Sequence, residues 1–238
     1  MDRDEYLDHL GADVERFAAA LERGPLDAPV PWCGQWRLAD LGEHLGDVHR
    51  WATRAVLRGT PGEPDPDPAP PDPVGMAAWL RAGAGPLLAV LAAVDLDGPT
   101  WHPFPIPKVG AVWPRRQAQE TSVHRWDAER AIGLSPTIDA ALAADGIDEY
   151  FGLALPRVMR REGRTAPAGS LRVQATDSGD EWQVESRDGT IVSAVGDPTV
   201  TISGTAQDVL LALWRRPVPD GVVVIDGTDP GWLDLGGM

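Results

Sequence analysis

A single cysteine, Cys33, is present among the 238 residues. One thiol excludes a disulfide within the chain and a zinc site built from several cysteines. Basic residues are also scarce, since 21 Lys and Arg stand against 36 Asp and Glu and leave a formal net charge of −15. This charge repels phosphate backbones and anionic lipid. We therefore expect neither nucleic acid nor a membrane as a partner.

Signals for export and for membrane insertion are missing as well. The start of the chain, MDRDEYLDHL, has no basic n-region and no apolar h-region, so no secretory signal is visible. No apolar run approaches the ~18 residues that a membrane span requires. With 43% apolar and 24% charged residues, the composition is that of a soluble globular protein with a core. We expect a cytoplasmic location.

Apolar residues recur with a helical period through much of the chain. Such stripes indicate amphipathic helices, which end at glycine or proline. Seven prolines within residues 59–73 exclude a helix or a central strand there, so we expect an exposed loop. The helices that this pattern predicts span residues 3–23, 38–57, 75–94, 114–133 and 137–162, the last with a kink or a break at Pro156.

Beyond Gly163 the pattern changes to period two. The short runs LRVQAT, EWQVES, TIVSAV and TVTISG are typical of strands and are separated by turn sequences. One amphipathic helix, AQDVLLALWRR, precedes a final strand, VVVID. The sequence therefore predicts a two-domain α+β protein, with a helical bundle over residues 1–162 and a small α+β domain over residues 163–238.

Two predicted helices have a polar residue where the stripe is otherwise apolar. Glu120 and His124 lie one turn apart, which places their Cβ atoms about 6 Å from each other on one face. His44 interrupts the apolar register of an earlier helix. Each feature alone usually has no functional role: a Glu-x3-His pair is commonly solvated, and a lone core histidine usually finds a hydrogen-bond partner. Helices of a bundle bury their stripes against one another, however, so the polar centres can share one cation. His49 lies about 140° around the helix from His44 and is not expected to join them.

The segments around these residues resemble a known family. PWCGQWRLADLGEHLGDVHRW, followed about 70 residues later by RRQAQETSVHRWDAERAIG, is similar to the mycothiol-dependent maleylpyruvate isomerase family of actinobacteria. That family belongs to the DinB-like metal-binding four-helix bundles. SGTAQDVLLALWRRP resembles its second, sterol-carrier-like domain. The matching positions are Trp36, Asp40, Leu41, His44 and Leu45 in the first motif, and Glu120, His124, Arg125, Asp127 and Ala128 in the second. The first motif departs from its relatives in reading CGQW where they often read CPGW, which touches a turn and no ligand.

The resemblance implies a metal centre and a thiol cosubstrate. It makes His44, Glu120 and His124 the ligands of a divalent metal, with zinc as the favoured ion, although such a donor set accepts several divalent ions. Two imidazoles and one carboxylate leave an open position, as catalytic zinc sites do. The resemblance further implies mycothiol as the thiol, and it carries a substrate-binding arginine over to Arg215 or Arg216.

The function expected from this resemblance is a metal-dependent thiol-using enzyme. The thiolate would add to a small electrophilic substrate and then leave, as in a cis–trans isomerase, or be retained, as in an S-transferase. Two alternatives stay open: a noncatalytic metal- or ligand-binding member of the family, and a structural bundle whose histidines are ordinary.

Neighbouring residues have open roles. Asp127 either orients an imidazole or is a helix-surface acid. Arg116 and Arg125 flank the predicted ligands and could bind a substrate carboxylate, but we expect both to be solvated. Cys33 is expected to be a small buried side chain rather than a nucleophile.

Overall fold

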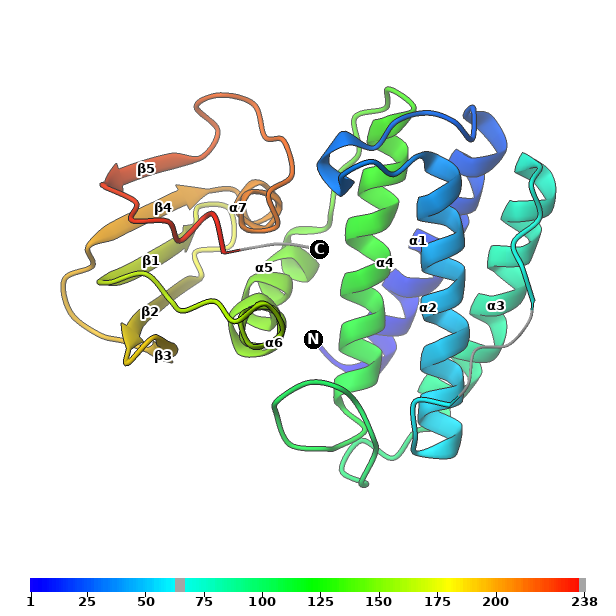
Figure 1. The fold of residues 1–238 in the computed structure, drawn as a ribbon, viewed down its shortest axis with the longest axis horizontal. Coiled ribbons are helices and arrows are strands. Elements are labelled where there is room, and N and C mark those ends of the chain that lie inside the picture. The colour runs from blue at the N-terminus through cyan, green and yellow to red at the C-terminus, as the bar shows by residue number, and fades with distance from the viewer. Residues whose placement is uncertain (63–66, 236–238) are drawn as a thin grey trace. The chain divides into compact units, whose positions relative to one another are not determined.

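The computed structural model describes residues 1–62 and 67–235, and it divides into two compact units (Figure 1). The first unit comprises residues 1–103 and 107–137, and the second comprises residues 104–106 and 138–238. The α+β class predicted from the change of period is confirmed. The division differs from the expected boundary at residue 162, because the helical segment after residue 138 belongs to the second unit.

Four helices of about twenty residues form the first unit. α1 packs against α3 and α4, and α2 packs against the same two helices. The proline-rich segment lies between α2 and α3, as predicted, although residues 63–66 of it are outside the described part of the chain. The helices are α1 (Arg3–Arg23), α2 (Leu38–Arg58), α3 (Pro73–Ala93) and α4 (Val112–Ala131).

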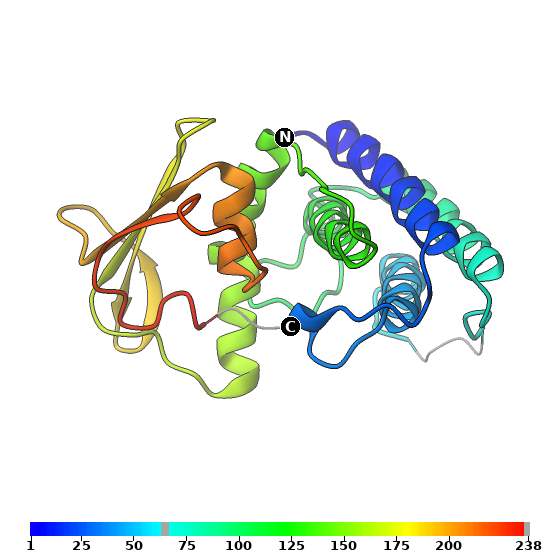
Figure 2. The ribbon, with the colours of Figure 1, turned by 90° about the horizontal axis from the view of Figure 1, so that it is seen from above.

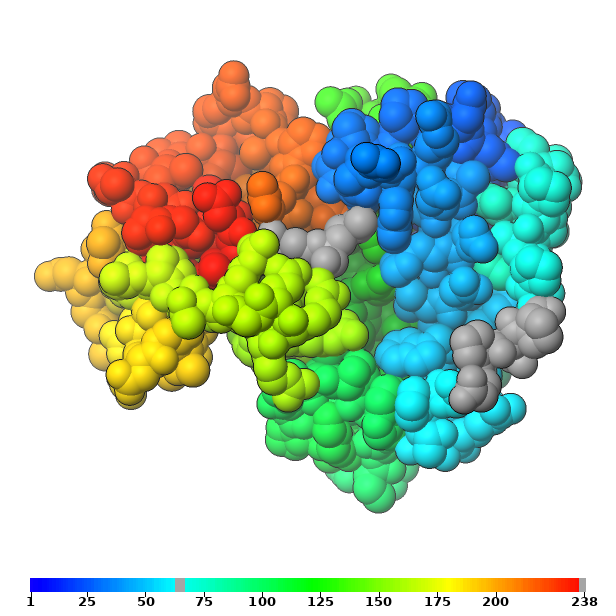
Figure 3. All heavy atoms as spheres, in the orientation of Figure 1, coloured from blue at the N-terminus to red at the C-terminus, as the bar shows by residue number. Residues whose placement is uncertain are grey.

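The ends and contacts of these helices follow from local sequence. Asp2 begins α1 with a capping box that includes Glu5. Gly46 on α2 allows close approach to α3, because a Cβ there would overlap the ring of Trp79. The opposite face of α2 carries exposed acids such as Glu43 and is visible in blue at the front of Figure 3. α2 is therefore held between the core and solvent.

The buried face of α2 differs from the predicted stripe. The fully buried positions include Leu41, Leu45 and His49, whereas His44 is only partly buried at the edge of this face. The sequence placed His44 within the apolar register of this helix, whereas the buried face is rotated by part of a turn and leaves His44 at its edge. This edge position turns His44 away from the apolar core and toward α4.

One described helix, α3, is long and apolar enough to cross a membrane by length and composition alone. The sequence did not lead us to expect such a helix, because the apolar residues of this segment do not form one uninterrupted run of sufficient length. Within the bundle, 44% of its most apolar window is buried. This is weak evidence for a membrane span, because core helices of soluble proteins pass the same test.

The second unit combines helices with a five-stranded sheet of order β3-β2-β1-β4-β5. β1 pairs parallel to β4, and the remaining neighbours are antiparallel. The helices of the unit lie on one face of the sheet, where α7 contacts β1, β4 and α5 (Figure 2). The helical elements are α5 (Ala140–Glu149), a π-helical segment (Tyr150–Ala154), α6 (Leu155–Glu162) and α7 (Ala206–Leu213). The strands are β1 (Ser170–Ala175), β2 (Glu181–Arg187), β3 (Thr190–Ser193), β4 (Val200–Gly204) and β5 (Val224–Gly227).

Candidate metal centre

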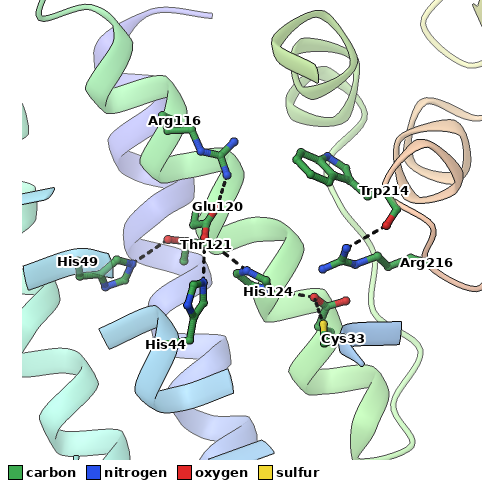
Figure 4. Close-up of polar contacts among 10 residues, drawn as sticks. Cys33, His44, His49, Arg116, Glu120, Thr121, His124, Trp214 and Arg216 are labelled. Atoms are coloured by element: carbon green, nitrogen blue, oxygen red, sulfur yellow. Dashed lines mark hydrogen bonds and ion pairs between the residues drawn. The ribbon is translucent and has the colours of Figure 1, made fainter. Parts of the chain in front are cut away.

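The three predicted ligands converge at one point in the first unit. α2 supplies His44, and α4 supplies Glu120 and His124 one turn apart (Figure 4). Oε1 of Glu120 lies 3.2 Å from Nε2 of His44 and 3.4 Å from Nε2 of His124. One ligand atom from each side chain lies within 4.8 Å of the others. A pair of residues and a single residue separated by 76 positions in the chain thus form a compact donor set.

These separations fit a divalent cation. With metal–ligand bonds of about 2.0–2.2 Å, two donors of a tetrahedral site lie about 3.3 Å apart. The two contacts of Glu120 Oε1, at 3.2 and 3.4 Å, bracket that value. Two imidazoles and a carboxylate are also a donor set typical of catalytic zinc, with one position open. The residues present therefore fit the group that the sequence predicted.

The carboxylate at the centre is held in its charged form. Burial opposes ionisation of Glu120, but Arg116 and hydrogen bonds from His124 and His44 outweigh it and keep the pKa of the carboxyl well below its usual value. Arg116 contacts Oε2, the oxygen that faces away from the two imidazoles. Glu120 is thus ready to act as an anionic ligand at neutral pH.

His124 is oriented by a carboxylate on its other side. Oδ2 of Asp127 lies 3.0 Å from Nδ1 of His124, and the Asp127 side chain is fully buried. Although burial lowers the pKa of His124, hydrogen bonds to Asp127 and Glu120 raise it above the usual value. This arrangement directs Nε2 of His124 toward the centre, as carboxylate–histidine pairs do beside metals. The alternative reading of Asp127 as a surface acid is wrong.

Cys33 belongs to the same hydrogen-bonded chain. Its Sγ donates to Oδ2 of Asp127 over 3.5 Å, and the residue is 1% exposed. The prediction of a small buried side chain is confirmed. Cys33, His124 and Asp127 form a second group of clustered ligand atoms in the described chain. Because Asp127 already accepts from both neighbours, we read this group as support for His124.

An aromatic ring covers one side of the centre. The ring of Trp36 lies 4.9 Å from that of His44 and 6.5 Å from that of His124, measured between centroids. The two imidazoles meet edge to face at 5.1 Å. Trp36 therefore limits the rotation of both imidazoles by contact.

The two flanking arginines are not solvated as expected. Arg116 is largely buried against Glu120, with 11% of its side chain exposed. Arg125 is fully buried and pairs with Asp13 on α1 and with Glu129, both at 3.0 Å. Both predictions of a solvated state are wrong, because each guanidinium has a carboxylate partner that offsets its burial.

His49 was set aside from the sequence, yet it is the most deeply buried histidine of α2. Its Nε2 lies 2.9 Å from Oγ1 of Thr121, the residue after Glu120. Burial lowers the pKa of His49 to about 3, so the imidazole is neutral at physiological pH. It is absent from the clustered ligand groups of the described chain. The signal in the sequence that could have identified His49 is its spacing, because it lies four residues after Leu45, which in turn lies four residues after Leu41.

The two candidate arginines of the second unit differ in environment. Arg216 is 5% exposed, and its Nη1 donates to the backbone oxygen of Trp214 at 3.0 Å (Figure 4). Arg215 is exposed and has a φ of 60°, in the left-handed region that non-glycine residues seldom adopt. The two arginines, which the sequence could not distinguish, therefore differ in burial and in backbone conformation.

A helical bundle with a clustered His–Glu–His set of side chains, followed by a small α+β domain, defines a two-domain class of α+β proteins. Within this class, the chain matches the family model of the mycothiol maleylpyruvate isomerase N-terminal domain over residues 7–129. It matches the model of the C-terminal domain of the same proteins over residues 141–234. The chain therefore belongs to the mycothiol maleylpyruvate isomerase family.

Solved structures agree with this assignment at the level of the fold. One is described as the crystal structure of the mycothiol-dependent maleylpyruvate isomerase, with a TM-score of 0.66 and 13% identity. A histidine-to-alanine variant of that enzyme gives a TM-score of 0.64 at 12% identity. Each comparison covers 97% of this chain and 95% of the other. No curated protein sequence matches the chain significantly.

Proposed function

We propose that this protein is a metal-dependent enzyme that uses a low-molecular-weight thiol, mycothiol, to attack a small electrophilic substrate. The observation that carries the proposal is Oε1 of Glu120, which lies at ligand–ligand distance from the imidazoles of His44 and His124. Family membership supports mycothiol as the thiol. A divalent cation in this donor set, with zinc as the best match, would supply an open position at which a thiol loses its proton readily.

The residues of the chain have distinct tasks in this proposal. His44, Glu120 and His124 hold the cation, and Asp127 keeps the Nδ1 proton of His124 so that Nε2 stays free to coordinate. No cysteine of the chain is the nucleophile, since the thiol of Cys33 donates to Asp127. The attacking sulfur therefore comes from the cosubstrate.

The reaction we propose is a cis–trans isomerisation of a conjugated acid. The thiolate forms a bond to one carbon of the double bond, whose electron pair moves onto the conjugated carbonyl. Rotation about the resulting single bond and expulsion of the same thiolate then give the trans product, with no net consumption of thiol. An S-transferase differs only in retaining the carbon–sulfur bond after a proton is taken up.

Metal analysis and activity test the proposal together. We expect about one zinc per chain in the purified, zinc-supplied protein. We expect far less in His44→Ala and Glu120→Gln, which each remove a ligand. His9→Ala, which removes a histidine of α1 that has no part in the donor set, is the matched control and should keep its zinc. A wild-type protein without stoichiometric metal contradicts the proposal.

Incubation with mycothiol separates the reaction classes. A cis-conjugated dicarboxylic or keto acid is followed by proton NMR for the trans isomer, and by mass spectrometry for a thioether. Trans product with thiol conserved indicates the isomerase, and a stable thioether indicates the transferase. Bound zinc with neither product indicates a noncatalytic metal-binding member of the family.

Two further variants test the assigned supporting roles. Asp127→Asn should weaken zinc binding by about 10–100-fold, as expected when the partner of a metal-bound histidine is lost. We propose Arg216, rather than Arg215, as the residue that binds the substrate carboxylate, because a buried guanidinium is preorganised. Arg216→Ala should raise the KM for the acid at unchanged zinc content, and Arg215→Ala should not.

A further inference from the structure

The two oxygens of Glu120 have different partners. Oε1 lies between the imidazoles of His44 and His124, whereas Oε2 contacts the guanidinium of Arg116, one turn earlier on α4. Both members of the pair are largely buried, with 11% of the Arg116 side chain and 18% of the Glu120 side chain exposed. One oxygen of the carboxylate thus belongs to the donor set, and the other is bound by the guanidinium of Arg116 (Figure 4).

The order of this pair argues against a role in helix stability. On an exposed helix, an acidic residue preceding a basic one by four positions stabilises more than the reverse order. Here the arginine comes first, and the pair lies on a face directed at the donor set. We therefore assign the effect of Arg116 to the carboxylate of Glu120 and not to the stability of α4.

We infer that Arg116 is a positioning residue that sets the charge and the mode of binding of the metal centre, an inference that rests on the proposed function. The contact at Oε2 leaves Glu120 a single oxygen for coordination. The guanidinium also cancels the carboxylate charge, so that two neutral imidazoles, one carboxylate and one guanidinium sum to zero.

The consequence is that Arg116 lowers the affinity of the centre for the metal and raises the affinity of the bound metal for anions. A divalent cation in a donor set of charge −1 forms a complex of net charge +1, whereas with Arg116 included the local charge is +2. Repulsion between the guanidinium and the cation weakens metal binding, and the same excess charge strengthens binding of an anion at the open position. Such an anion is the thiolate formed when a thiol releases its proton to water.

Arg116→Gln isolates this effect, because glutamine can still donate a hydrogen bond to Oε2 but carries no charge. We expect the variant to bind zinc about tenfold more tightly in competition with a chromophoric chelator. We expect its cobalt form to bind 2-mercaptoethanol about tenfold more weakly, followed through the thiolate-to-cobalt absorption. Arg116→Lys keeps the charge and should stay close to wild type in both measurements.

Arg130→Gln is the matched control, because it removes the same charge from an exposed position of α4 about 21 Å along the helix from Arg116. Both affinities should be unchanged. If Arg116→Gln alters the far-ultraviolet circular dichroism, Arg116→Ala provides the same comparison with the best helix-forming residue.

The opposite signs of the two effects make the test decisive. A merely structural role of Arg116 predicts that zinc and thiol binding both weaken, and that result, or no change in either, overturns the inference. A wild-type protein that binds no zinc instead contradicts the proposed function itself. The two failures are therefore distinguishable.

Discussion

At the scale of single residues, His44 and His49 show how five positions along α2 change the chemistry of an imidazole. His44 lies at the edge of the buried face and contacts Glu120. His49 lies inside that face, fully buried, with one ring nitrogen 2.9 Å from Thr121. Among the described residues, its other ring nitrogen has no hydrogen-bond partner. A buried imidazole without an acidic partner is neutral, and a group that stays neutral in the folded state lowers the stability of the protein at acidic pH.

His49 makes stability dependent on pH. Burial, the largest influence, lowers its pKa from 6.5 to about 3; Glu120 opposes the shift, and Arg50, His44 and His124 add to it. Between these values the unfolded state binds a proton that the folded state refuses, so stability falls as pH falls. We expect a loss of about 2 kcal/mol between pH 7.5 and pH 5 from this residue.

Urea unfolding of the chelator-treated protein at the two pH values measures this loss. His49→Gln retains a partner for Thr121 and cannot be protonated, so its stability should decrease with acid by about 2 kcal/mol less than that of wild type. His9→Gln, on α1, is the control and should follow wild type. Parallel pH curves for His49→Gln and wild type would contradict the assigned pKa.

Residue spacing was sufficient for some parts of the centre and not for others. Glu120, His124 and Asp127 could be grouped because i+3 and i+4 positions share a helix face. The same rule would have revealed Arg116 beside Glu120. The bond from Cys33 to Asp127 joins residues 94 positions apart and depends on how a turn packs against α4. No local pattern contains that information.

At the scale of elements, α4 is unusual in burying charged residues on more than one side. Arg125 contacts Asp13 of α1 and Glu129, at 3.0 Å each, on a face that also approaches the core. The periodicity of apolar residues could not predict this face, since its members are polar in sequence and buried in the fold. Long-range ion pairs replaced apolar contacts there.

Removal of Arg125 should expose the cost of this arrangement. Arg125→Met leaves Asp13 and Glu129 buried without their shared cation, and we expect a loss of about 3–5 kcal/mol in the free energy of unfolding. Arg16 also pairs with Glu129, but its side chain is 43% exposed. Arg16→Met is therefore the matched control, with an expected loss of at most about 1 kcal/mol. Chemical denaturation measures both, and equal losses would contradict the role of burial.

The helical segment around Pro156 shows the limit of propensity. The sequence predicted a kink or a break there, and the α-helical pattern is interrupted just before Pro156 by a π-helical segment, Tyr150–Ala154, after which the chain continues as α6. Proline lacks the N–H for a helical bond and its ring crowds the carbonyl four residues earlier. A π-helical turn inserts one extra residue and accommodates this loss without ending the helix.

At the scale of the whole molecule, the order of periods along the chain predicted the architecture. Helical periods followed by period two gave an α+β chain with a bundle first, and the strands lie where the alternation placed them. The division into units was not accessible in the same way. α5 has the pattern of a bundle helix but packs against α7 of the second unit, and an apolar stripe does not specify its partner.

All three proposed ligands lie in the first unit, so metal binding should stabilise specific elements of the full chain. Binding to the folded form alone adds stability and suppresses local opening of the segments it joins. We expect zinc, added to chelator-treated protein, to slow amide hydrogen exchange in peptides of α2 and α4, measured by mass spectrometry. Peptides from β1 and β2, which supply no ligand, serve as the internal reference. Glu120→Gln should abolish the protection of α2, because it removes the central carboxylate, whose Oε1 lies beside the imidazoles of both His44 on α2 and His124 on α4. Protection of α4 without α2 would mean that His44 does not bind the metal, and the centre would then consist of α4 residues alone.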